Sequence, residues 1–156
     1  MNHEPWRGPV LIDIPADPHV LFLVRAVVER LAKKAGLEED RVNRLIQAVD
    51  EACTNIIRHG YGGPSDERIS MRLLWTGETL EVHIRDFAPF PDPETLRPRD
   101  LGEIRPGGLG LHFILAGADE VKYEVPEDGK GCLLRLIVRR SPREVHDEDK
   151  DGRDSP

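Results

Sequence analysis

The segment from Arg41 to Gly63, RVNRLIQAVDEACTNIIRHGYGG, constrains the fold of this 156-residue chain more than any other. Its apolar residues recur every three or four positions, which predicts a helix that packs with one face. The residues of this apolar stripe are Val42, Leu45, Val49, Cys53 and Ile56. Glu51, Asn55 and His59 stand at i, i+4 and i+8, so they form a polar stripe on the roughly opposite side. That stripe is either a solvated face or a ligand site.

The hydrophobic period changes from 3.6 to 2 after this helix. Residues 68–75 and 80–85 alternate between apolar and polar on either side of a turn at 76–78, which is typical of antiparallel strands with one buried face. The remaining predicted elements are a strand over 6–14, a helix over 18–34 capped by Asp17, a helix over 111–118, and strands over 121–125 and 132–138. Because helices and strands segregate, the predicted fold class is α+β. We expect a single-domain two-layer sandwich in which helices cover one face of a mixed or antiparallel sheet.

Length and composition limit the domain organisation and the partners. We predict an N-terminal extension over 1–9, one domain over 10–140, and a disordered tail over 141–156 that carries six acidic and three basic residues. The net charge of -7 argues against nucleic acid as the main partner. No apolar run approaches the roughly 20 residues of a membrane span, and the N-terminus does not read as a secretory signal. We therefore expect a cytoplasmic protein.

Two further segments carry chemistry. Asp86 ends an apolar strand and precedes a proline-rich loop, where its carboxylate either accepts a hydrogen bond from a ligand or serves turn chemistry. The segment Arg105-Pro-Gly-Gly-Leu-Gly-Leu111 leads into the third predicted helix. Glycines and the first amides of a helix can surround a phosphate, although the same residues can form a hinge.

In combination, these features resemble a known family. The pattern ExxxNxxxHxY on a helix, an Asp at a strand end, and GGLGL before another helix occur in the order of the GHKL (Bergerat) ATP-binding fold of gyrase, MutL repair proteins and sensor histidine kinases. Within that fold, residues 10–139 are similar to the bacterial anti-sigma factor serine/threonine kinases. VDEACTNIIRHGYGG is similar to their first nucleotide box, and RPGGLGLHFI to their lid and the helix that follows it.

The resemblance implies a role for each matching residue. Glu51 would be the catalytic base, and Asn55 would be the ligand of Mg²⁺. Nucleotide contacts would come from Asn55, Asp86, Ala88, Arg105, Gly108, Leu109 and Gly110, with Asp86 accepting the adenine amine. For His59 and Tyr61, which also match, a core or capping role stands beside ligand contact.

The resemblance also implies an activity and partners. A protein of this kind phosphorylates a small anti-sigma antagonist with Mg-ATP, sequesters a sigma factor, and forms a homodimer. The alternatives are a partner-switch module that binds ATP with little or no catalysis, a detached histidine-kinase ATP domain, and a hydrolytic GHKL ATPase.

This chain departs from the family pattern at two positions. Ala88 stands where Gly is common, and its methyl group would crowd a nucleotide if the backbone there needed a positive φ. Cys132 stands where the hydroxyl of Thr often helps to read adenine, and a thiol is a weak donor.

Overall fold

The alternating segments of the chain pair into one five-stranded sheet in the computed structural model, which describes residues 4–89 and 109–140. The strands are β1 (Val10–Ala16), β2 (Ser65–Trp75), β3 (Thr79–Asp86), β4 (Glu120–Glu124) and β5 (Cys132–Arg139). Their order is β1-β2-β3-β5-β4, and every neighbouring pair is antiparallel. The expected antiparallel or mixed sheet therefore takes its antiparallel form.

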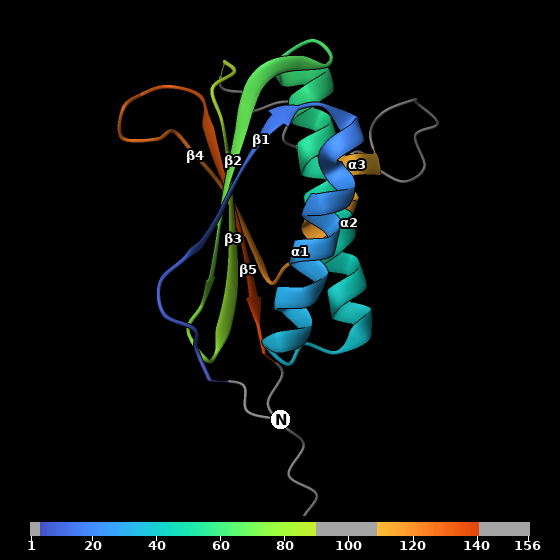
Figure 1. The fold of residues 1–156 in the computed structure, drawn as a ribbon, viewed down its shortest axis with the longest axis vertical. Helices are drawn as coiled ribbons and strands as arrows, with labels where there is room; N and C mark the ends of the chain where they lie inside the picture. Colours follow the sequence, from blue (N-terminus) through green and yellow to red (C-terminus); the bar gives the residue numbers. More distant parts are fainter. Residues whose placement is uncertain (1–3, 90–108, 141–156) are drawn as a thin grey trace, which may run out of the picture.

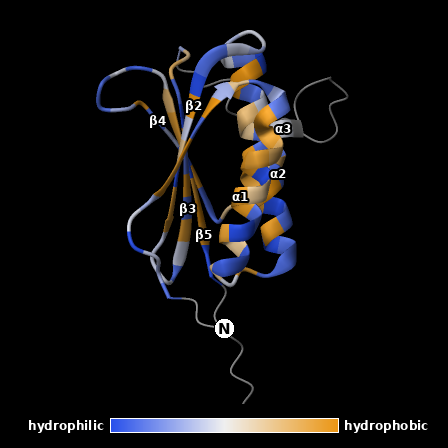
Figure 2. Cartoon of the chain, viewed as in Figure 1, coloured by the Kyte–Doolittle hydropathy of each residue, from blue (hydrophilic) through white to orange (hydrophobic). Residues whose placement is uncertain are grey.

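The helices cover one face of this sheet (Figure 1). They are the short 3₁₀ turn η1 (Pro18–Val20), α1 (Leu21–Lys34), α2 (Glu39–Asn55), the π-helical turn η2 (Ile56–Gly60) and α3 (Leu109–Ala116). Helix α2 contacts both α1 and α3, so it is the central helix of its layer. Hydrophobic residues are concentrated in both layers (Figure 2), and the buried core lies between them. The predicted two-layer α+β fold is confirmed.

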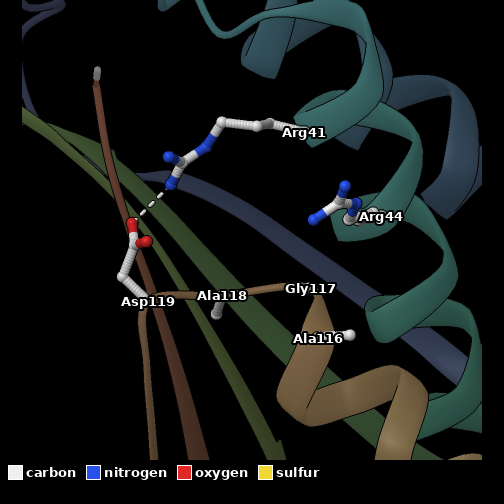
Figure 3. Close-up of a pocket in the computed structure, with 6 residues that line it drawn as sticks. All are labelled: Arg41, Arg44, Ala116, Gly117, Ala118 and Asp119. Atoms are coloured by element: carbon white, nitrogen blue, oxygen red, sulfur yellow. Dashed lines mark hydrogen bonds and ion pairs between the residues drawn. The ribbon is translucent and has the colours of Figure 1, made fainter. Parts of the chain in front are cut away.

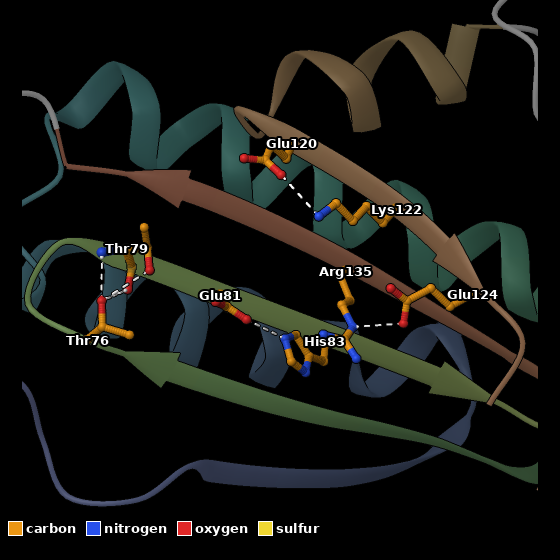
Figure 4. A network of polar contacts seen from close by, with 8 residues as sticks. All are labelled: Thr76, Thr79, Glu81, His83, Glu120, Lys122, Glu124 and Arg135. Atoms are coloured by element: carbon orange, nitrogen blue, oxygen red, sulfur yellow. Dashed lines mark hydrogen bonds and ion pairs between the residues drawn. The ribbon is translucent and has the colours of Figure 1, made fainter. Parts of the chain in front are cut away.

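The other face of the sheet carries many charged residues, together with apolar ones such as the exposed Leu11. His83 lies between the buried Val82 and Ile84, so its side chain points away from the helices. Figure 4 shows His83 paired with Glu81 at 2.7 Å, in a row of ion pairs that continues with Arg135–Glu124 at 3.1 Å.

Strand β1 begins at Val10, not at Trp6 as predicted. Gly8 has φ of 71°, which interrupts an extended strand. The Trp6 ring instead lies beside the ring of Trp75, with 6.5 Å between their centroids. Trp6 thus packs against the core from outside the sheet.

The predicted central helix is not α-helical throughout. Regular α2 ends at Asn55, and the chain continues through η2, where Tyr61 N–H donates to the carbonyl of Ile56. The predicted core residues Val42, Leu45, Val49 and Cys53 are buried, whereas Ile56 is only partly buried and Ile57 takes the core position. Because a π turn holds more residues per turn, His59 leaves the polar stripe and is exposed.

Helix α3 begins and ends two residues earlier than predicted. Its C-terminal end lies close against α2, because a Cβ added to Gly117 would come within 2.3 Å of Ala48 Cβ and 2.7 Å of the Arg44 carbonyl oxygen. The predicted loop over 86–106 lies outside the described residues from position 90 onward, and so does the predicted tail over 141–156. Within the part of the chain that is described, we find no helix that is both long and apolar enough for a bilayer span.

Candidate functional site

Helix α2 presents Glu51 and Asn55 to the first turn of α3. Both side chains are partly buried. A Cβ added to Gly110 would lie 2.9 Å from Glu51 Oε2 and 3.6 Å from Asn55 Nδ2, so only a glycine lets α3 approach these polar atoms without a shift. The structure thus brings together three residues that the sequence had assigned to one site, from segments 55 residues or more apart.

Asp86, at the end of β3, is the one charged residue in the core of the described chain, with 7% of its surface exposed. The Ala88 N–H donates to its Oδ1 at 2.9 Å. Burial raises the pKa of Asp86 to about 6, against the N–H groups of Ala88 and Cys132 and the charge of Arg85, which lower it. A buried carboxylate of this kind is a strong acceptor that lacks a cationic partner within the core.

The turn before β5 closes tightly on Asp86. Gly131 has φ of 71°, and a Cβ there would lie 1.9 Å from the carbonyl oxygen of Asp86. Cys132 is opposite Asp86 in the β3–β5 register. Burial, with the Asp86 charge second, raises the pKa of the Cys132 thiol to about 12, and burial raises that of Tyr123 to about 12. Both groups therefore stay neutral beside the carboxylate at physiological pH.

Ala88 is buried without backbone strain. All residues with positive φ in the described chain are glycines, so the condition under which its methyl group would crowd a nucleotide is not met. Instead, Ala88 Cβ lies 3.1 Å from where a Cβ on Gly60 would stand. The missing side chain at Gly60 makes room for the methyl group at Ala88.

Tyr61 and Gly60 were not assigned to the site from the sequence. The sequence of Tyr61 and its neighbours is compatible both with a core or capping role and with ligand contact. In the structure its hydroxyl donates to the carbonyl of Arg68 at 2.7 Å and accepts from the N–H of Phe87 at 2.8 Å. The sequence signal was the run His-Gly-Tyr after the polar stripe, but one sequence cannot show that this segment reaches Asp86.

Two predicted nucleotide contacts, Arg105 and Gly108, lie outside the described residues. Leu109 is the first residue of α3. The described residues thus contain two parts of the predicted site. One consists of Glu51, Asn55 and Gly110, and the other of Asp86 and Ala88. The π-helical turn η2 connects the two parts.

The donors present suit Mg²⁺ better than a metal that needs a full protein cage. No group of three or more His, Cys, Asp or Glu side chains that could hold a metal occurs among residues 4–89 and 109–140. Mg²⁺ commonly takes one or two protein oxygens, completed by water and phosphate. The amide oxygen of Asn55 fits that need.

A depression lies at the end of α2 opposite to Asn55. It has a volume of about 110 Å³ and is lined by Arg41, Arg44 and residues 116–119 (Figure 3). Arg41 contacts Asp119 at 2.5 Å, and Arg44 contacts Asp40 at 2.5 Å. A carboxylate thus pairs with each of the two guanidinium groups at this depression.

Comparison with known proteins matches residues 14–138 to the histidine kinase-like ATPase domain. The serine-protein kinase RsbW of Listeria monocytogenes is 34% identical over 143 residues, which cover 86% of this chain and 91% of that protein. The protein of the same name from Bacillus subtilis is 30% identical over 120 residues, or 71% of this chain and 74% of that one.

Two solved structures share the fold. The RsbU and RsbW domains of a Mycobacterium tuberculosis protein align with a TM-score of 0.59 at 19% identity, over 84% of this chain and 32% of that larger one. The SiaB-SiaC complex of Pseudomonas aeruginosa aligns with a TM-score of 0.57 at 11% identity, over 83% of this chain and 88% of the other.

Proposed function

Because this chain belongs to the histidine kinase-like ATPase domain family, we propose that it is a serine/threonine-protein kinase of the anti-sigma type. The observation that carries the proposal is the contact of Glu51 and Asn55 with Gly110 at the start of α3. It joins a carboxylate, a carboxamide and a glycine-rich helix start. Phosphoryl transfer depends mainly on positioning and charge stabilisation, which these groups can supply.

Glu51 is the proposed catalytic base. Its Oε2 lies at the α2–α3 contact, where it can accept the proton of a serine or threonine hydroxyl as that hydroxyl attacks the terminal phosphorus of ATP. The Gly110 backbone gives phosphates a close approach because no Cβ intervenes. Gly108, Leu109 and Arg105 are proposed to extend this phosphate contact.

Asn55 is the proposed protein ligand of Mg²⁺, which when bound would neutralise part of the triphosphate charge. Its place at the junction of α2 and η2 directs the carboxamide toward Gly110. Asp86 is proposed to accept a hydrogen bond from the adenine amine, with Ala88 N–H fixing one carboxylate oxygen. Ala88 is proposed to line the adenine pocket.

The partners follow from the same proposal. The kinase would phosphorylate a small anti-sigma antagonist protein and sequester a sigma factor, acting as a homodimer in the cytoplasm. Curated relatives named serine-protein kinase RsbW, which match most of this chain, support the kinase part. The solved SiaB-SiaC complex supports a protein partner for this fold.

The test uses radiolabelled ATP with lysate of the native host and three variants of α2. Glu51→Gln keeps the shape of the side chain but removes the base, so Mg-ATP should bind while phosphate transfer falls by roughly 10²- to 10⁴-fold. Asn55→Ala removes the metal ligand, so the gain in ATP affinity on adding Mg²⁺ should disappear. Gln47→Ala is the matched control, because Gln47 is exposed one turn before Glu51 on α2.

Transfer of label to a serine or threonine of a small protein by the unmodified chain, and by Gln47→Ala, would support the proposal. Equal transfer by all three variants would exclude Glu51 and Asn55 from catalysis. Partner binding without any transfer would favour the alternative of a non-catalytic partner-switch module.

A further inference from the structure

The Tyr61 hydroxyl joins two backbone segments that do not otherwise pair. The β2–β3 ladder ends at Ser70 opposite Arg85. Two residues further along each strand, Arg68 and Phe87 would face each other if the pairing continued. Arg68 still pairs with Pro15 of β1 on one side of β2, but on the β3 side the Tyr61 oxygen lies between the Arg68 carbonyl and the Phe87 N–H. The phenol thus replaces a direct contact at the point where the two strands separate.

This bridge acts directly after Asp86. Phe87 N–H is held by Tyr61, and the next N–H, of Ala88, is held by the Asp86 carboxylate. Burial raises the pKa of Tyr61 in spite of the Phe87 N–H, which lowers it, and the nearby Asp86 and Glu67 add to the rise. The hydroxyl therefore keeps its proton and donates to Arg68 at physiological pH.

The same short segment connects the turn to the nucleotide helix. Gly60 ends η2, which follows Asn55 directly, and its Cα side faces the Ala88 methyl group at close range. The chain from Asn55 to Tyr61 therefore contacts the Asp86–Ala88 turn at two points. One is the hydroxyl of Tyr61, and the other is Gly60, whose missing side chain leaves room for the Ala88 methyl group.

We propose that Tyr61 is a positioning residue for nucleotide binding, whose hydroxyl, with Gly60, sets the Asp86–Ala88 turn relative to the helix that carries Glu51 and Asn55. This rests on the proposed function, since it assumes that Asp86 receives adenine. In this proposal the Tyr61 side chain contacts backbone groups of the protein and does not contact the nucleotide. Its effect is to hold the adenine acceptor at the right separation from the phosphate end.

The first test is Tyr61→Phe, with affinities for adenosine and ATP measured by displacement of a fluorescent ATP analogue. Loss of the bridge should weaken both ligands by the same factor, about 5- to 10-fold, because the adenine end alone is disturbed. The gain in ATP affinity on adding Mg²⁺ should stay unchanged. Gln47→Ala is the control, because Gln47 is an exposed residue of α2 outside both segments that Tyr61 joins.

The second test exchanges the methyl group across the Gly60–Ala88 contact. Gly60→Ala should crowd Ala88 and weaken adenosine several-fold, while the double variant Gly60→Ala, Ala88→Gly should recover most of that loss. This arm remains informative if Tyr61→Phe folds poorly. Ala88→Gly alone should not tighten binding, because Ala88 is free of backbone strain.

Unchanged adenosine affinity in Tyr61→Phe, or additive effects in the double variant, would overturn the inference while leaving the kinase proposal intact. A loss of the Mg²⁺-dependent gain in Tyr61→Phe would also overturn it, since that indicates general loosening of α2. If the unmodified chain bound neither adenosine nor ATP, both proposals would fall together.

Discussion

At the residue scale, Asp86 has two opposed effects on the molecule. Its burial makes it a strong acceptor for a ligand amine, and the same burial raises its pKa to about 6 from the ordinary 3.8. A carboxyl whose pKa is higher in the folded than in the unfolded chain stabilises the fold only when it is protonated. That contribution is complete below pH 3.8 and is lost as pH rises through about 6. Ligand binding and stability should therefore change in opposite directions with pH.

The first prediction follows from this titration. Adenosine affinity should fall as the medium is acidified through pH 6, by up to about tenfold per pH unit, because the acceptor becomes protonated. Adenosine is the suitable probe since it carries no phosphate that titrates nearby. Asp86→Asn should bind adenosine weakly at every pH. At pH 8 its affinity should be lower than that of the unmodified chain by roughly 10- to 150-fold.

The same variant gives a control on stability. Asp86→Asn should unfold at an equal or higher temperature than the unmodified chain at pH 8, because it removes an ionised group from the core. Calorimetric titration and thermal melts between about pH 5 and 8 would measure both effects. Affinity that does not vary with pH in the unmodified chain would remove Asp86 from the binding site.

Residues of the candidate site could be predicted from the sequence where the residue type itself suggests a chemical role. Glu51, Asn55, Asp86 and Gly110 were assigned because their order along the chain resembles a known family, and the structure brings Glu51, Asn55 and Gly110 into contact. The roles of Gly131 and Tyr61 could not be predicted, because they depend on contacts with backbone atoms of a distant segment. The positive φ that would make Ala88 crowd a nucleotide is not present, and only the fold shows that Gly60 makes room for its methyl group.

At the element scale, α2 determines where the site lies, and it does so through its two neighbours. Arg25 of α1 contacts Asp50 at 2.5 Å, and α3 approaches along the opposite side through Gly110 and Gly117. Sequence periodicity predicted α2 because its apolar stripe is long. It could not predict η2, because a π turn depends on tertiary contacts and leaves no period of its own.

A second prediction concerns this helix contact. Gly117→Ala would place a Cβ 2.3 Å from Ala48 Cβ and 2.7 Å from the Arg44 carbonyl oxygen, so α3 must move away from α2. Overpacking of this kind costs about 1–3 kcal/mol, or a fall of several degrees in the melting temperature. ATP affinity should fall as well, since Gly110 is carried on the same helix.

Gly129→Ala is the matched control for Gly117→Ala. Gly129 has φ of 69° but nothing within 4 Å of an added Cβ, so it reports backbone strain without crowding. Its loss of stability should be about 1 kcal/mol, with ATP affinity unchanged. If Gly117→Ala melted at the same temperature as the unmodified chain, α3 would be shown to move away from α2 without loss of stability.

At the scale of the whole molecule, the core of the described chain coincides with the family match over residues 14–138. Among residues 4–89 and 109–140, the five strands and the helices that cover them lie between Val10 and Arg139, and the buried residues extend from Ile14 to Val138. The domain bounds of 10 and 140 stay a prediction from the sequence, made where the apolar periodicity stops. Strand order could not be predicted, since β5 lies between β3 and β4 through a pairing that no local pattern specifies.

A third prediction therefore concerns residues 141–156. Deleting this acidic segment should leave the melting temperature unchanged within about a degree, because its sequence offers almost no apolar surface to bury. Thermal melts of the two chains would decide it. A fall of several degrees would show that the segment contributes to the fold, and altered partner binding at an equal melting temperature would assign it an electrostatic role.

The contact between Gly60 and Ala88 has a consequence for how such a chain can evolve. With alanine at 88, a methyl group at 60 meets a neighbour 3.1 Å away, so the two positions are not free to change independently. With a methyl group at both positions, one segment must shift by a few tenths of an ångström, so a substitution at one position changes the cost of a substitution at the other. The order in which the two substitutions arise therefore affects how well each is tolerated.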